Sequence, residues 1–171
     1  TVSRILAKCL NCVGPDGNGG ITSKPCGVCT ACREIDADRY IDYTELDAAS
    51  NNGVDAMRDL LGRVSMGTSG NRKVYVLDEV HMLSAGASNA LLKTLEEPPE
   101  HVVFVLATTE PEKVLPTIRS RTQHFEFNLL PADVLAAHVR HVIADAGLEL
   151  DDVGAEPARG RHGPLDLLGD R

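Results

Sequence analysis

The sequence predicts an α/β fold in which helices flank a parallel sheet. Two continuous apolar runs, residues 73–77 (KVYVL) and 102–106 (VVFVL), are typical of strands that are buried on both faces. Segments with helical spacing separate and follow these runs. Aromatic residues make up only 4% of the chain, so the core must be mainly aliphatic, which suits a layered α/β fold.

The first half of the chain predicts a helix, a loop, a strand and a second helix. Residues 1–11 place apolar side chains close to helical spacing, and residues 13–24 are rich in Gly, Pro, Asn and Asp, as loops are. Residues 40–46 are consistent with a strand. The helix that follows is expected to be capped by Asn51 or Asn52.

The second half predicts helices after each buried strand. Residues 87–97 form a helical pattern stopped by two prolines, and residues 113–121 form another after a proline. Residues 125–127 are expected to form a short last strand, and residues 131–146 an amphipathic helix that ends at a glycine. Alternating strands and helices indicate a doubly wound sheet, which binds ligands at the carboxyl ends of its strands.

Composition excludes several functional classes. The formal charge of −8 argues against broad non-specific nucleic-acid binding, because neutralising phosphates requires clustered Lys and Arg. No stretch approaches the roughly 18 uninterrupted apolar residues of a membrane span, and the N-terminal residues lack the apolar run and the cleavage site that are typical of a signal peptide. We therefore expect a cytoplasmic protein of one compact domain with a small appendage.

Five cysteines lie between positions 9 and 32, and four of them have the spacing of a metal site. Two residues separate each of the last three, and such spacing points successive thiolates at one ion. Four sulfurs close a tetrahedral structural zinc site, and the predicted ligands are Cys12, Cys26, Cys29 and Cys32. Cys9 is also spaced by two from Cys12 and is a competing ligand, but we expect it to be a bystander on the first helix. Ordinary free thiols explain the crowding poorly.

An acidic pair, Asp78 and Glu79, ends the first buried strand. P-loop ATPases hold Mg²⁺ through the first acid of such a pair and orient the attacking water with the second. The pattern alone is moderately specific, since many strands end in an acidic turn. His81 and Met82, which follow, are expected to be packing residues rather than ligands.

Polar residues also follow the second buried strand. Thr109 lies just after it and is a candidate sensor of a γ-phosphate, while an arginine late in the next helix is placed to reach a neighbouring subunit. Each residue has a simpler interpretation: Thr109 as a turn cap, and Arg119 and Arg121 as solvated helix ends.

Taken together, these motifs resemble one family closely. The order LNC, PCGVCTAC, ELDAAS, VYVLDEVHML, NALLKTLEEPPEHVVFVLATTEP and LPTIRSR is similar to the clamp-loader ATPase of bacterial replication, the gamma/tau subunit of DNA polymerase III. The resemblance covers roughly residues 1–150. It implies an AAA+ P-loop NTPase core with a parallel sheet flanked by helices and a zinc-binding insertion, incomplete at both ends.

The resemblance also implies a domain organisation. Residues 1–130 correspond to a truncated AAA+ domain with the zinc module at about 12–33, and residues 131–150 to the start of a helical lid domain. Residues 151–171 are atypical and are expected to be disordered or frame-shifted. The four predicted cysteine ligands match the family's zinc ligands, whereas Cys9 matches a position that is not a ligand.

Roles for the site residues follow from the same resemblance. Asp78 and Glu79 match the Walker B acids, so Asp78 is expected to coordinate the Mg²⁺ of ATP and Glu79 to polarise the attacking water. Thr109 matches the first sensor. Ser120 and Arg121 match the start of a Ser-Arg-Cys signature whose arginine acts in trans, and Thr122 replaces its cysteine, which leaves the guanidinium charge in place.

The phosphate-binding loop of the family is missing from this sequence. Family members place a strand and a G-x-x-x-x-G-K-[ST] loop before the first helix, and this chain begins about two residues after the position of that lysine. The second sensor's arginine and the oligomerising collar domain are absent too. We therefore expect this polypeptide alone neither to bind ATP well nor to hydrolyse it.

Three functions compete. The gamma/tau motor would bind the other subunits of a hetero-oligomeric ring, the sliding clamp, primed DNA and the polymerase III core. A delta-prime-like scaffold would keep the zinc module and the trans-acting arginine without hydrolysis, but it would not need the acidic pair, so the pair favours the motor. A zinc-ribbon nucleic-acid module would need basic and aromatic residues near the cysteines, where only Lys24 and Arg33 lie close by.

Overall fold

The first part of the molecule is built around a three-stranded parallel sheet. The computed structural model describes residues 1–148, which fall into two units, Thr1–His124 and a second that begins at Phe125. In the first unit the strands β1 (Tyr43–Asp47), β2 (Lys73–Asp78) and β3 (Val102–Leu106) pair in the order β1-β2-β3. The predicted α/β fold with a parallel sheet is confirmed.

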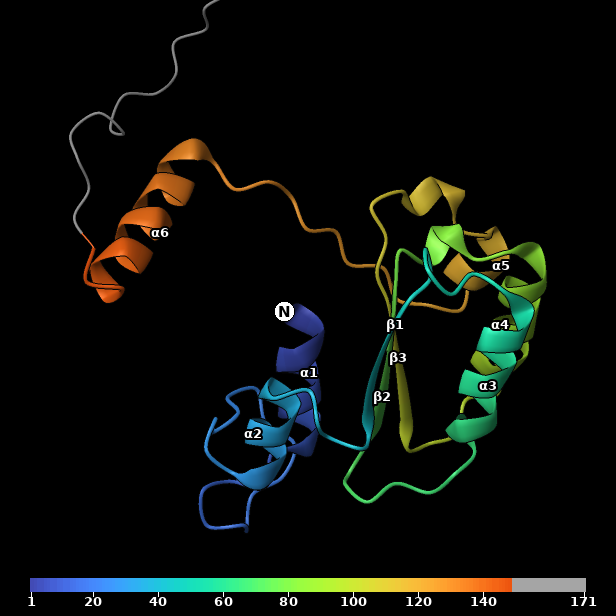
Figure 1. The fold of residues 1–171 in the computed structure, drawn as a ribbon, viewed down its shortest axis with the longest axis horizontal. Helices are drawn as coiled ribbons and strands as arrows, with labels where there is room; N and C mark the ends of the chain where they lie inside the picture. Colours follow the sequence, from blue (N-terminus) through green and yellow to red (C-terminus); the bar gives the residue numbers. More distant parts are fainter. Residues whose placement is uncertain (149–171) are drawn as a thin grey trace, which may run out of the picture. The chain divides into compact units, whose positions relative to one another are not determined.

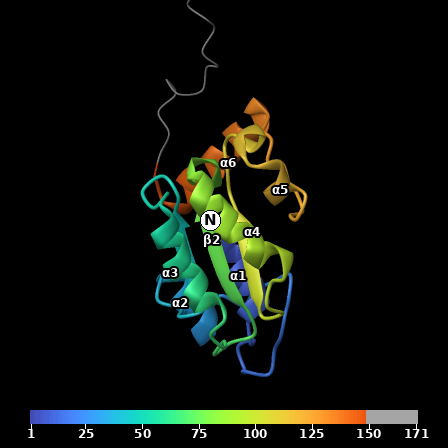
Figure 2. The same ribbon diagram turned by 90° about the vertical axis from the view of Figure 1, so that its right-hand side faces the viewer.

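Helices cover both faces of this sheet (Figure 1). In Figure 2 the viewer looks at the sheet through α3 and α4, with α1 behind it. Two short 3₁₀ turns follow β2 and β3. The helical elements of the first unit are α1 (Val2–Asn11), α2 (Thr30–Asp36), α3 (Val54–Val64), η1 (Val80–Met82), α4 (Ala85–Glu96), η2 (Pro111–Lys113) and α5 (Pro116–Arg119).

The central strand β2 is buried on both faces, as its continuous apolar sequence indicates. Val74 and Val76 pack in a cluster with residues of α1 and α2, whereas Tyr75 and Leu77 pack in the larger cluster with α3 and α4. Successive side chains of a strand point to opposite faces, so one apolar run supplies both layers. The ring of Tyr75 stacks on that of Phe104 in β3, with centroids 5.7 Å apart.

The strands end together at one side of the sheet. Asp47 of β1 is in register with Asp78 of β2, and Leu77 with Leu106 of β3. The turns beyond these ends are also joined, because Val80 donates its backbone N–H to the carbonyl of Ala107 at 3.0 Å. We call this side, residues 78–81 and 107–110, the carboxyl edge.

Two expected elements differ in the structure. Residues 125–127 form no strand within the described part of the chain, so that prediction was wrong; a strand needs a neighbour for its backbone hydrogen bonds, and this segment pairs with none. Of the helix expected over residues 113–121, only the four residues of α5 (Pro116–Arg119) are α-helical. Leu115 has an extended ψ of 132° because a residue before proline avoids the helical region, so a helix starts afresh at Pro116.

The start of α3 also differs from expectation. Its N-cap is Gly53, not Asn51 or Asn52. The side chain of Asn51 instead donates to the carbonyl of Asp47 at 3.0 Å and stabilises the turn after β1.

The second unit contains the predicted amphipathic helix, α6 (Ala132–Asp145). It ends before Gly147, whose φ of 66° lies in the left-handed region that favours glycine after a helix. The tail expected over 151–171 lies outside the described residues. Within residues 1–148 no helix is both long and apolar enough to cross a bilayer.

Candidate functional site

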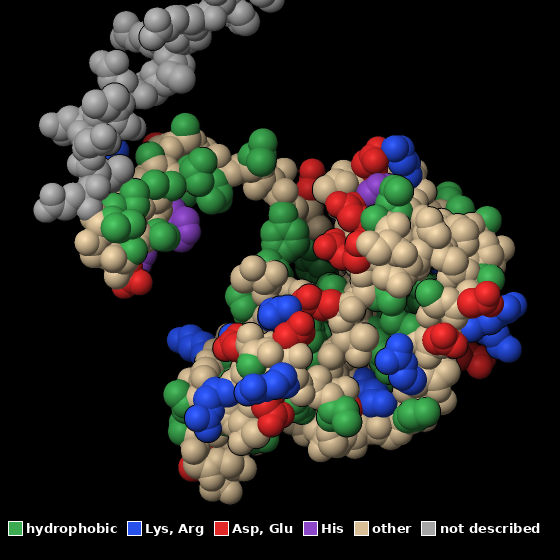
Figure 3. All heavy atoms as spheres, viewed as in Figure 1, with side chains coloured by type: hydrophobic (Ala, Val, Ile, Leu, Met, Phe, Trp, Pro, Cys, Tyr) green, Lys and Arg blue, Asp and Glu red, His purple; other side chains and the backbone are tan. Residues whose placement is uncertain are grey.

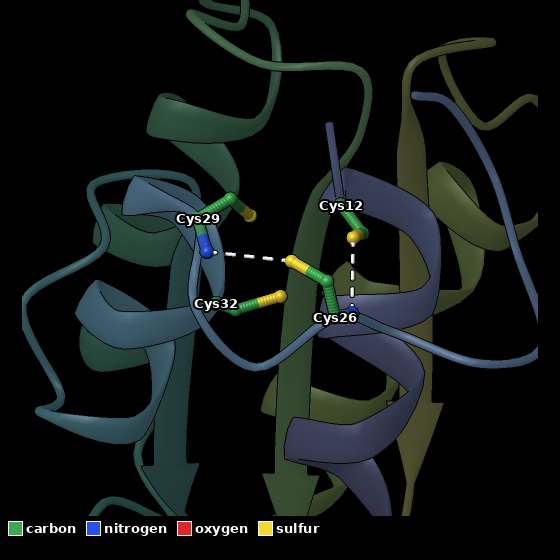
Figure 4. Close-up of side chains that lie close together, drawn as sticks. All are labelled: Cys12, Cys26, Cys29 and Cys32. Atoms are coloured by element: carbon green, nitrogen blue, oxygen red, sulfur yellow. Dashed lines mark hydrogen bonds between the residues drawn. The ribbon is translucent and has the colours of Figure 1, made fainter. Parts of the chain in front are cut away.

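Four cysteines converge from three parts of the chain. Cys12 is the C-cap of α1, where the backbone turns extended, and Cys29 is the N-cap of α2. Cys26 comes from the loop between these helices and Cys32 from the first turn of α2. Their Sγ atoms point toward one another (Figure 4) and all lie within 4.8 Å of each other. The structure therefore brings together the four cysteines that the spacing predicted.

The donor set fits a structural zinc ion. Four sulfurs at the usual Zn–S distance of about 2.3 Å would lie about 3.8 Å apart, so only a small contraction of the cluster is needed. Four sulfur ligands complete the tetrahedral coordination of zinc and leave no open ligand position for catalysis. Cys12, Cys29 and Cys32 are buried, and Cys26 is half-buried. Cys9 is half-buried and does not belong to the four-cysteine cluster.

Backbone amides already stabilise negative sulfur in this cluster. Cys12 accepts the N–H groups of Cys26 at 3.3 Å and Gly14 at 3.4 Å, and these bonds lower the pKa of its thiol. Burial opposes ionisation of Cys29, but backbone N–H groups outweigh it and lower the pKa of that thiol to about 6. Burial raises the pKa of Cys32 to about 12. A cation is what would let all four ionise together.

The residue before Cys12 connects this cluster to the sheet. Asn11 is 2% exposed, and its Oδ1 accepts the backbone N–H groups of Asn71 at 3.1 Å and Arg72 at 2.9 Å. These two residues lead directly into β2. No local pattern signals this contact, because its partners lie 60 residues apart and only the fold brings them together.

The acidic pair lies at the carboxyl edge. Asp78 is the last residue of β2 and is exposed, and its Oδ1 accepts the N–H of Glu79 at 3.0 Å. Glu79 has a φ of 49°, a left-handed conformation that costs a non-glycine residue about 1 kcal/mol or more. Such strain persists only where the surroundings hold it in place.

Thr109 lies beside this pair, as the order of the strands requires. Its Oγ1 donates to Oε2 of Glu79 at 3.1 Å. The sequence did not reveal the neighbouring contact, in which Oγ1 of Thr108 lies 2.8 Å from Nδ1 of His81. The sequence signal that could have predicted both contacts is a pair of hydroxyl residues directly after one buried strand and an acidic turn directly after the other.

His81 was expected to be a packing residue, and this is only half right. Its side chain is 7% exposed, but both ring nitrogens meet polar atoms. Nδ1 lies 3.3 Å from Oε2 of Glu79 and Nε2 lies 3.3 Å from Oε1 of Glu110. Figure 3 shows acidic side chains gathered around a histidine at this edge of the first unit.

Arg121 makes its contacts with residues other than the acidic pair. Its guanidinium forms an ion pair with Glu96 of α4 at 2.7 Å and donates to the carbonyl of Thr117 at 2.8 Å. The arginine's side chain remains 34% exposed. The structure thus brings Asp78, Glu79 and Thr109 together, whereas Arg121 contacts Glu96, Thr117 and Ser120 instead.

Comparison with known proteins gives this arrangement a context. A family model described as "DNA polymerase III, delta subunit" matches residues 1–131. The gamma subunit of DNA polymerase III from Buchnera aphidicola is 46% identical over 153 residues, which are 89% of this chain and 41% of that protein. The tau subunit from Escherichia coli K12 is 49% identical over 144 residues, 84% of this chain but 22% of that protein.

Solved structures agree on the fold. A gamma subunit-related protein of DNA polymerase III from Thermotoga maritima matches with a TM-score of 0.50 and 25% identity, covering 78% of this chain and 46% of that one. A point mutant of RuvB from the same organism matches with a TM-score of 0.54 and 19% identity, over 70% of this chain and 40% of that one. The second likeness shows an AAA+-like α/β fold and nothing more.

The chain spans less than half the length of these curated relatives, so it corresponds to one part of them. The residues that the family model matches include both the cysteine cluster and the carboxyl edge. The chain belongs to the family of DNA polymerase III subunits that includes the gamma and tau subunits.

Proposed function

We propose that this chain is part of a clamp-loader subunit that couples ATP binding and hydrolysis to loading of the sliding clamp on primed DNA. The observation that carries this proposal is the carboxyl edge, where Asp78, Glu79 and Thr109 meet at the ends of two adjacent parallel strands. Ligands of such sheets bind at that position. Residues 1–130 would form the ATPase domain and residues 131–150 the start of a helical lid.

Each residue of the edge has a role that its chemistry supports. Asp78 is exposed and one of its oxygens is held by the N–H of Glu79, which suits a carboxylate that coordinates the Mg²⁺ of ATP. When bound, that ion would neutralise charge on the phosphates. Glu79 accepts a hydrogen bond from Thr109 and would orient the attacking water, and Thr109 would report the γ-phosphate to it.

ATP binding also needs a phosphate cradle, and the 171 residues contain no G-x-x-x-x-G-K-[ST] sequence. We expect the isolated chain to bind ATP weakly and hydrolyse it poorly. The activity is therefore proposed for the complete protein, as are its partners: the other subunits of a hetero-oligomeric ring, the sliding clamp, primed DNA and the polymerase III core.

Arg121 would act on a neighbour. Its guanidinium pairs with Glu96 and not with the chain's own acidic pair. An arginine at the site of an adjacent subunit would stabilise the charge that develops on the transferred phosphoryl group. Arg121→Ala in the complete protein should slow turnover without weakening ATP binding by the same subunit, and equal loss of both would refute a role in trans.

The cysteine cluster would hold a structural zinc ion. The convergence of four Sγ atoms within 4.8 Å supports this assignment, and metal analysis of freshly purified, reduced protein tests it. About one zinc per chain is expected, and none in a variant with Cys32→Ser.

A second function remains in competition, that of a scaffold subunit that does not hydrolyse ATP. The description of the matching family model, which names the delta subunit, is the observation that favours it. The intact acidic pair favours the motor. The same experiment distinguishes the two.

That experiment measures Mg²⁺-dependent ATP hydrolysis by the complete protein in its assembled ring. Glu79→Gln should retain ATP binding and lose about 100-fold or more in kcat, and Asp78→Asn should weaken Mg²⁺-dependent binding. Glu112→Gln, an exposed carboxylate change in the neighbouring turn, is the matched control and should leave activity unchanged. Unaltered hydrolysis in Glu79→Gln would refute the motor assignment for this edge.

A further inference from the structure

His81 occupies a place at the carboxyl edge that none of the proposed catalytic roles explains. It lies in the 3₁₀ turn η1, two residues beyond Glu79, and its side chain is 7% exposed. A buried imidazole must find partners for its ring nitrogens. Nδ1 has Oγ1 of Thr108 as its hydrogen-bond partner at 2.8 Å, and carboxylate oxygens of Glu79 and Glu110 lie 3.3 Å from Nδ1 and Nε2.

These contacts connect the acidic turn after β2 to the loop after β3. Glu110 belongs to that loop, and its own N–H donates to Oγ1 of Thr108 at 3.0 Å. Its carboxylate also pairs with Lys113 of η2 at 2.5 Å. His81 therefore lies between Glu79 and a segment that is already cross-linked internally.

The conformation of Glu79 shows why such a support is needed. At a φ of 49° its backbone is strained, and its side chain is 35% exposed, so burial alone does not fix the carboxylate. Thr109 donates a hydrogen bond to Oε2 at 3.1 Å, and Nδ1 of His81 lies 3.3 Å from the same oxygen. A water-orienting carboxylate must be placed to within a fraction of an ångström, because a misplacement of about 1 Å can cost about 100-fold in rate.

We propose that His81 is a positioning residue for Glu79: its ring joins this carboxylate to the loop 108–110 and fixes where the oxygen points. The inference rests on the proposed ATPase function, and it goes beyond it by adding a residue that acts through Glu79. The loop that carries Thr109 thereby holds Glu79 by two routes, one direct and one through the imidazole.

Substitutions separate positioning from packing. His81→Phe keeps a buried ring and removes both nitrogens, and in the complete protein it should lower kcat for ATP about 10-fold to 100-fold with KM little changed. His81→Asn places an amide near the position of Nδ1, toward Glu79 and Thr108, and should recover part of that loss. Met82→Leu, a change at the exposed neighbouring residue, is the control and should match the wild type.

A double substitution completes the test. If His81 acts through Glu79, His81→Phe should cause no further loss of kcat when added to Glu79→Gln, because the group it positions is already inactive. A further loss, an unchanged kcat in His81→Phe alone, or no rescue by His81→Asn would overturn the positioning role while leaving the ATPase proposal intact. Unaltered hydrolysis in Glu79→Gln alone would refute both.

Discussion

Asp42 offers a sharp test of how the sheet is anchored. This residue is 4% exposed and lies just before β1. Its Oδ2 accepts four hydrogen bonds from the loop before β2: Oγ1 of Thr68 at 2.9 Å, N and Oγ of Ser69 at 2.8 and 2.7 Å, and N of Gly70 at 2.9 Å. Its carbonyl also accepts the N–H of Val74 at 2.8 Å. Asp42 thus fixes the start of the strand that ends in the acidic pair.

The loss of unfolding free energy on substituting Asp42 follows from these contacts. Asp42→Ala removes the acceptor for four donors in a partly buried loop, and hydrogen bonds to a charged group contribute about 1.5–3 kcal/mol each when counted singly. Because the four share one oxygen and water can reach part of the loop, we expect about 3 kcal/mol in total. Asp42→Asn retains an acceptor but loses its charge, and should cost about 1.5 kcal/mol. Ser69→Ala removes one donor and should cost about 1 kcal/mol.

The stability that the Asp42 carboxylate contributes should decrease as the pH falls. Burial alone would raise the pKa of Asp42, but the hydrogen bonds from Ser69, Thr68 and Gly70 outweigh it and lower the pKa below its ordinary value. A lowered folded-state pKa contributes stability above the unfolded value of about 3.9, and that stability is lost as the pH falls through the folded value. The difference between wild type and Asp42→Asn should therefore be constant from about pH 5 to about pH 8 and shrink below about pH 4.

Urea unfolding followed by circular dichroism measures these differences, with zinc present at equal concentration in every sample. Comparing the variant with the wild type at each pH cancels the titration of the cysteines and other carboxylates. A difference below about 0.5 kcal/mol for Asp42→Ala, or a difference for Asp42→Asn that stays flat down to about pH 3, would refute the reasoning.

Other perturbations test the metal centre, a close backbone approach and the core. Cys32→Ser or a strong chelator should speed amide exchange in α2 at least about 10-fold while β2 changes less, and equal protection with and without metal would count against a structural ion. Gly70→Ala sets a methyl group against the Tyr40 hydroxyl and should cost about 1–3 kcal/mol of unfolding free energy. Leu77→Ala, at a fully buried site, should cost about 2–5 kcal/mol, whereas Ile41→Ala, 80% exposed, should stay within about 0.5 kcal/mol. Thermal or urea unfolding of each variant measures these last three costs, and equal costs at Leu77 and Ile41 would contradict the assigned core.

Local patterns predicted the elements whose structure depends on near neighbours. The strand over 102–106 has the predicted bounds, and the strand over 73–77 extends by one residue to Asp78. The spacing of the cysteines predicted their cluster, because a two-residue gap restricts where thiolates can point. The helix over 87–97 begins two residues earlier than expected, where Ser84 caps it by accepting the N–H of Ala87 at 3.2 Å.

Errors arose where a distant partner or a proline decides the outcome. The strand over 125–127 was expected from its apolar residues alone, but a strand forms only with a neighbour, which composition does not reveal. The helix α2 within the cysteine module was missed because its seven residues are too short for a clear period.

The sequence by itself determined the parallel α/β core, the four-cysteine cluster and the position of Asp78 and Glu79 at a strand end. These features follow from the order of side chains along short segments. Only the tertiary structure decided that His81 meets Glu79, Thr108 and Glu110, and that Asn11 holds the loop before β2. The reason is physical: parallel strands join segments that are far apart in the chain, so polar side chains from separate loops become neighbours only when their carboxyl ends align.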